Sequence, residues 1–364
     1  MEKFFCAEAS RCAQEDPIGT VSPVQTYVLV ECPQPWAANA IDSRVVPEGL
    51  RQVMQDIQTR NSTGQSISQW ESQPFGKFNH QLNQQRFGQQ HDFASVRFLL
   101  IHRNTTQATG CQTVLIYRQK TEGFCQGYDR YEFSVQGLEQ AAQVIRQFFS
   151  QPPLPARMCD RGQDLLICTH GSHDQCCARY GNPFYAQACK VVSSLVESDR
   201  TIQVWRSSHF GGHRFAPTAI TFPDGRYYAR LNPFSLKSVL TRSGNLQLLS
   251  QIYRGWGILP PELQVMERSL WMQLGWGWAG VAIAHQVLER QPEQQRLKAV
   301  LHYLEGGSLR HCYGQLVVDP DRSLDLKPSC HGAQVSSFLK YKLEKLHFQS
   351  DPCVSVSKVV NHWL

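Results

Sequence analysis

Two short segments rich in cysteine and histidine, each placed directly after a predicted strand, constrain the fold of this chain most. The first, CTHGSHDQCC over 168–177, follows the apolar run DLLI, and the second, SSHFGGHRF over 207–215, follows TIQVWR. The segment PFYAQACKVVSSLV over 183–196 predicts a helix that begins at its proline and crosses from one strand to the other. Such a crossover makes the strands parallel neighbours, so Cys168 and His209 should lie together at the carboxyl edge of an α/β sheet.

The residues upstream of these segments predict a separate N-terminal region over 1–155. Period-two and apolar patterns predict four strands there, at 26–32, 95–103, 113–119 and 130–135. A helix is predicted to follow them at 137–149. The glutamine-rich stretch 52–90 has no decisive pattern. The prolines of SQPPLPARMCDRGQ then interrupt regular structure and predict a boundary before a central domain over 156–245.

Downstream, the sequence predicts that the central domain ends in a hairpin and a helix, followed by a helical and β region over 246–364. The hairpin is expected to turn at 223–225, where Pro-Asp-Gly interrupts two apolar runs, and the helix to span 234–240. The last region predicts a helix from Pro260, two strands and a lysine-protected edge strand, at 298–304, 313–319 and 338–348.

Composition narrows the classes of function. The chain has 364 residues and a formal charge of +6, without clusters of Lys and Arg, which argues against nucleic acid and hints at an acidic partner. It contains no secretory signal and no run of about 18 apolar residues, so we expect a cytoplasmic protein that does not enter a membrane. The 13 cysteines are then expected to be reduced and available for cofactor or redox chemistry.

Four donors from the two segments form a Cys2His2 set: Cys168, Cys177, His209 and His213. Zinc and a 2Fe-2S cluster both accept two thiolates and two imidazoles. The spacing does not match a zinc finger, and no glutamate follows the first histidine as a metalloprotease would need. Spacing alone leaves zinc and iron-sulfur open.

Other residues of the segments have simpler expected roles. We expect Cys189 to pack in the core, as free cysteines often do. We expect His170 and His173 to be solvated or to form hydrogen bonds in a polar loop. Gly211 and Gly212 argue against a helix between the two downstream histidines and favour a tight loop.

CTHGSHDQCCARYGNP, together with VWRSSHFGGHRFAPTAITFPDGRYYARL, resembles the signature of the sucrase/ferredoxin-like family. Weaker similarity in TYVLVECPQPW and YRGWGILPPELQ extends the resemblance over most of 1–280. It implies an α+β fold whose central α/β domain is a thioredoxin-like ferredoxin, with a mixed sheet flanked by helices. It also implies that a 2Fe-2S cluster is held by Cys168, Cys177, His209 and His213.

The resemblance also suggests roles for the residues next to these ligands. Cys176 adjoins Cys177 and could take its place, but the family pattern pairs an aspartate, here Asp174, with a cysteine three residues on. Arg214 either supports the site or forms an ordinary surface salt bridge. Sugar hydrolysis lacks support, because Asp160, Asp164 and Asp174 around the cysteine motif give no sign of the facing carboxylate pair that it requires.

Three functions follow from these observations. The first is electron transfer or redox sensing by one 2Fe-2S cluster, with proton-coupled reduction through the histidines and a reductase or electron acceptor as the protein partner. Such a chain is an electron carrier rather than a catalyst with its own substrate. The alternatives are a cluster-free thiol-disulfide oxidoreductase, with Cys176 and Cys177 or Cys168 as reactive thiols but without the usual Cys-x-x-Cys, and a binding module with structural zinc.

Overall fold

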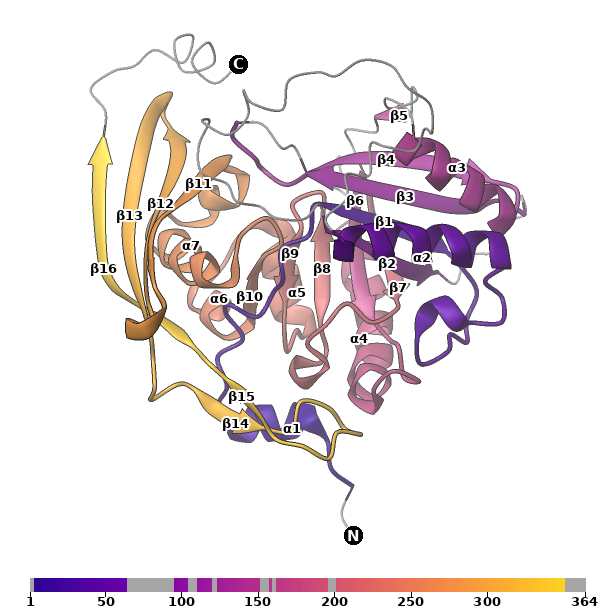
Figure 1. Cartoon of the computed structure of the whole chain (residues 1–364), viewed down its shortest axis with the longest axis horizontal. Helices are drawn as coiled ribbons and strands as arrows, with labels where there is room; N and C mark the ends of the chain where they lie inside the picture. The colour runs from indigo at the N-terminus through magenta and orange to yellow at the C-terminus, as the bar shows by residue number, and fades with distance from the viewer. Residues whose placement is uncertain are drawn as a thin grey trace.

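One ten-stranded mixed sheet runs through the molecule, which is known from a computed structural model describing residues 3–63, 95–103, 110–119, 123–150, 157–158, 162–195 and 201–350. The sheet is strongly curled (Figure 1), and its strand order is β10-β9-β8-β6-β7-β2-β1-β3-β4-β5. The strands are β1 (Thr26–Glu31), β2 (Val96–His102), β3 (Gln112–Gln119), β4 (Tyr128–Val135), β5 (Arg157–Met158), β6 (Gly162–Cys168), β7 (Thr201–Ser207), β8 (Ala219–Phe222), β9 (Arg226–Tyr228) and β10 (Tyr253–Trp256).

Both faces of the N-terminal strands are covered, which explains why these strands read as apolar runs. On one face, Val28 and Val30 of β1 pack with the helices α2 (Glu48–Thr63) and α3 (Leu138–Ser150), which lie beside β1 to β4 in Figure 1. On the other face, Tyr27 and Leu29 belong to a core that continues through the central and C-terminal segments. The predicted strands and helix of this region are confirmed, with small shifts in their ends.

The predicted fold class, with a central thioredoxin-like α/β domain, is wrong. Strands β6 to β9 do not form a small sheet of their own but lie between β10 and β2 in the ten-stranded sheet. Strand β7 pairs antiparallel with β2 through Ile101–Ser207 and His102–Arg206, which joins the central strands to the N-terminal ones. Local patterns specify where strands lie, whereas this pairing joins residues about 100 positions apart. The domain limits at 155 and 245 stay predictions.

The C-terminal residues build a second layer on the same core. Helix α7 (Pro261–Leu274) begins at the double proline as predicted and packs against a four-stranded sheet ordered β11-β12-β13-β16. Its strands are β11 (Ile283–Gln291), β12 (Arg296–Glu305), β13 (Ser308–Val318) and β16 (Tyr341–Ser350). Strand β16 lies at the edge of this sheet, as its lysines predicted.

The remaining elements are a small sheet and the other helices. Strands β14 (Leu324–Leu326) and β15 (Ser336–Phe338) form a two-stranded sheet that lies beside α1 (Cys6–Cys12) in Figure 1. The other helices are α4 (Gln175–Ser193), α5 (Pro233–Thr241), α6 (Gln247–Ile252), η1 (Ala40–Asp42), η2 (His213–Phe215), η3 (Trp276–Gly280) and η4 (Pro292–Gln294). None of the helices in the described ranges is both long and apolar enough to cross a membrane.

Two local predictions around the cysteine segment have different outcomes. Strands β6 and β7 are parallel, with Cys168 opposite Ser207, as the crossover argument requires. The helix predicted to begin at Pro183 instead begins at Gln175, so Pro183 lies inside α4. The reason is Asp174, whose carboxylate accepts the Cys176 N–H and caps the helix eight residues earlier. Of the glutamine-rich stretch, residues 64–90 lie outside the described residues.

Candidate metal centre

Cys168 and Cys177 lie together at the carboxyl end of β6, and His209 faces both of them. The Nδ1 atom of His209 is 3.8 Å from the Cys168 Sγ and 3.6 Å from the Cys177 Sγ. The three donor atoms all lie within 4.8 Å of one another, so a single metal ion could contact all three. The parallel pairing of β6 with β7 produces this arrangement, because the loop after β7 emerges beside Cys168.

Helix α4 brings Cys177 to this place through a close contact with β6. A Cβ added at Gly181 would lie 2.0 Å from the Cys168 carbonyl oxygen, so only glycine permits this approach. Cys177 itself lies in the first turn of α4, and its N–H donates to the Asp174 carbonyl at 3.1 Å. The two thiols therefore come from a strand end and a helix start that are pressed together.

The loop between the two histidines is a tight turn, as its glycines predicted. Gly211 and Gly212 have φ values of +98° and +82°, in the left-handed region that favours glycine. A Cβ at Gly212 would lie 2.4 Å from the guanidinium of Arg254, which donates to the Gly211 carbonyl at 3.0 Å. Arg254 thus fixes the turn and places a buried cation beside it.

His213 belongs to a second donor group that includes His209, and its Nδ1 lies 3.3 Å from the Cys6 Sγ. Its ring centroid is 5.1 Å from that of His209, and the donor atoms of His173, His209 and His213 form a second group within 4.8 Å. The His213 Nδ1 is 3.4 Å from an Asp174 carboxylate oxygen. Two donor groups therefore adjoin and share His209, and the four predicted ligands are divided between them.

His170 and His173 orient His209 rather than lying free in a polar loop. His170 is buried, its Nε2–H donates to the Ala37 carbonyl at 2.7 Å, and its Nδ1 accepts the His209 N–H at 3.1 Å. The exposed His173 stacks on His209 with ring centroids 3.9 Å apart. The expected hydrogen bond of His170 is confirmed, but its burial and the stacking of His173 on His209 could not be predicted from local sequence patterns.

Burial keeps both downstream imidazoles neutral. Desolvation, with weaker contributions from nearby histidines, lowers the pKa of His209 to about 2. Desolvation also lowers the pKa of His213 to about 4, although the Asp174 charge acts in the opposite direction. The contact with Cys168 and burial raise the pKa of Cys177. At neutral pH the site therefore offers uncharged imidazole lone pairs, and a cation would be needed to hold the Cys177 thiol as a thiolate.

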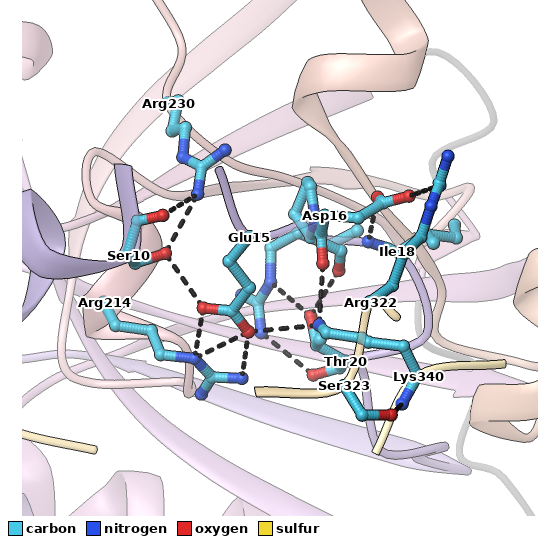
Figure 2. Close-up of polar contacts among 12 residues, drawn as sticks. Ser10, Glu15, Asp16, Ile18, Thr20, Arg214, Arg230, Arg322, Ser323 and Lys340 are labelled. Carbon is cyan, nitrogen blue, oxygen red and sulfur yellow. Dashed lines mark hydrogen bonds and ion pairs between the residues drawn. The ribbon is translucent and has the colours of Figure 1, made fainter. Parts of the chain in front are cut away.

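Three residues near the predicted ligands, Cys176, Cys189 and Arg214, have different surroundings. Cys176 does not join Cys168 and Cys177 but lies in another group with Cys6 and Cys330. Cys189 is half-buried and packs against the core, as predicted. Arg214 forms an ion pair at 3.0 Å with the buried carboxylate of Glu15, so it supports the fold and is not an ordinary surface salt bridge (Figure 2).

Comparison with known protein families agrees with the motif. The model of the sucrase/ferredoxin-like family matches residues 17–255, about two thirds of the chain, and this range contains all four predicted ligands. The chain belongs to the sucrase/ferredoxin-like family. No curated protein and no solved structure matches it.

Proposed function

We propose that this member of the family carries one 2Fe-2S cluster on Cys168, Cys177, His209 and His213 and serves in electron transfer or redox sensing. The observation that carries the proposal is the pair of donor groups that share His209, one with two thiols and the other with imidazoles only. One tetrahedral ion needs four donors. The His213 donor atom does not belong to the group formed by Cys168, Cys177 and His209, so the four proposed ligands suit a centre with two metal ions better than a single ion.

The donor chemistry fits the cluster. Thiolates and imidazoles together ligate 2Fe-2S centres, and the bound cluster supplies a one-electron couple. Two neutral imidazoles in place of two thiolates make the centre less negative, so its potential should exceed the roughly −400 mV of plant-type ferredoxins. The buried Arg254 cation, which donates to Gly211 between the two histidines, acts in the same direction.

The proposal extends to proton uptake and to a partner. A histidine ligand retains a second ring nitrogen, and reduction raises its affinity for a proton, so the midpoint potential should fall as pH rises. An electron carrier needs a reductase or an electron acceptor, and the excess of basic residues favours an acidic docking face on that partner.

Iron and sulfide content tests the proposal. Protein purified without oxygen should contain about two irons and two acid-labile sulfides per chain. Cys168→Ser and Cys177→Ser should lose most of both because each removes a thiolate, whereas Cys176→Ser and the matched control Cys189→Ser should retain them. Wild-type protein that contains zinc but no iron or sulfide would contradict the proposal. Iron loss in Cys176→Ser but not in Cys177→Ser would show that Cys176, and not Cys177, is the ligand.

A cluster-free thiol-disulfide oxidoreductase is the weaker candidate. Cys168 and Cys177 are both almost fully buried, and the pKa of Cys177 is raised, whereas exchange requires an accessible thiolate. A mononuclear zinc site at these residues would need the His213 donor in the same group as the two thiols and His209, whereas His213 belongs to the adjoining group. The arrangement therefore favours the cluster over both alternatives.

A further inference from the structure

A second group of thiols lies beside the first centre and is formed by residues far apart in the chain. It contains Cys6 at the start of α1, Cys176 in the first turn of α4, and Cys330 between β14 and β15. The three Sγ–Sγ distances are 3.6 Å for Cys6–Cys176, 3.3 Å for Cys176–Cys330 and 3.6 Å for Cys330–Cys6. An Asp174 carboxylate oxygen lies 3.8 Å from the Cys6 Sγ, and all four donor atoms lie within 4.8 Å of one another.

We propose that Cys6, Cys176 and Cys330, with Asp174 as the fourth donor, bind one zinc ion in a closed structural site distinct from the 2Fe-2S centre. Zinc–sulfur bonds of about 2.3 Å in a tetrahedron place the sulfurs ~3.8 Å apart, close to the spacing of these thiols. A disulfide would use two thiols and leave the third, whereas here all three converge on one point. Three thiolates and a carboxylate form a donor set that zinc accepts.

The two adjacent cysteines of α4 face different centres. Successive residues on a helix are rotated by about 100°, so Cys176 and Cys177 cannot point to the same place. Cys176 meets Cys6 and Cys330, while Cys177 meets Cys168 and His209. This geometry explains the pair of cysteines in the sequence, because each serves a different site.

The backbone around the second site is arranged to hold anionic donors. The Ala7 N–H donates to the Cys176 Sγ at 3.4 Å, and the N–H groups of Cys176 and Cys330 donate to the two Asp174 carboxylate oxygens at 2.8 and 2.9 Å. Cys6, Cys176 and Asp174 are at most 1% exposed, whereas Cys330 is half-buried and leaves a path for the ion to enter.

A network of ion pairs brings the distant segments to this place. Figure 2 shows Glu15 between Arg214 and Lys340, with both N–O distances 3.0 Å, and Asp16 next to Arg322. Residues 15 and 16 follow α1, while residues 322 and 340 flank β14 and β15, so the network holds both sides of the Cys6–Cys330 contact. Cys6 and Cys330 lie outside the 17–255 match, so the family match does not include this site. The zinc ion would fasten both chain segments over the central sheet.

Metal analysis of the full chain, purified without chelator from medium containing zinc, tests the site. We expect about one zinc per chain in the wild type, and a fall to less than a tenth of that value in Cys6→Ser and Cys330→Ser. The matched control Cys12→Ser, at the exposed end of α1, should retain its zinc. Cys168→Ser should lose iron and retain zinc, which separates failure of this site from failure of the 2Fe-2S proposal.

A second measurement covers variants that fold poorly. A zinc chelator should lower the melting temperature of the wild type and of Cys12→Ser, because removing the ion removes stabilisation specific to the folded state. The chelator should leave the melting temperature of Cys330→Ser unchanged. Wild-type zinc content in Cys6→Ser and Cys330→Ser would overturn the proposal, as would a disulfide among the three cysteines in peptides from unreduced protein.

Discussion

At the scale of single residues, the neutral state of His213 gives a stability that depends on pH. The folded-state pKa is lowered to about 4, below the ordinary value of about 6.5, mainly by desolvation. Between these values the unfolded chain binds the proton and the folded chain does not, so acid favours unfolding. In metal-free protein, the free energy of unfolding should fall by about 1.4 kcal/mol per pH unit from His213 alone as pH drops from 6 to 4.5. Urea unfolding of wild type and His213→Asn at a series of pH values measures this dependence. If the free energy of unfolding changes with pH equally in both proteins, His213 is not its source.

At the scale of elements, Gly181 controls whether α4 can rest on the end of β6. An added Cβ would lie 2.0 Å from the Cys168 carbonyl oxygen, so Gly181→Ala must push the helix away. We expect a loss of about 1–3 kcal/mol in stability and a lower iron content, because Cys177 moves away from Cys168. Gly277→Ala is the control, since a Cβ there meets nothing within 4 Å. Gly181→Ala protein with wild-type iron content and stability would show that the close contact is not needed.

The elements also show how far the sequence alone predicts this fold and site. The parallel pairing of β6 with β7 could be predicted, because a strand, a helix and a second strand follow one another directly in the sequence. The start of α4 was missed because Pro183 resembles a first-turn proline, whereas the Asp174 cap starts the helix earlier. Cys6 and Cys330 lie 170 and 154 positions from Cys176, and no local pattern links such distant residues.

At the scale of the whole molecule, the ten-stranded sheet accounts for the place of the first centre. Pairing of β7 with β2 inserts the central strands into the larger sheet, α1 packs against η2, which follows β7, and the β14–β15 pair lies beside α1 (Figure 1). Three distant parts of the chain thus meet around Asp174. Its carboxylate contacts His213 of the first centre and Cys6 of the second thiol group. We therefore expect the electronic structure of the centre to depend on two histidines that are held in place by these contacts.

Pulsed electron paramagnetic resonance of the reduced protein tests the central claim most directly, because unpaired spin on iron detects directly bound nitrogen. The wild type should show strong coupling to two histidine nitrogens, and His209→Cys and His213→Cys should each show one, provided that the cluster assembles. A reduced cluster without strong nitrogen coupling would contradict ligation by His209 and His213.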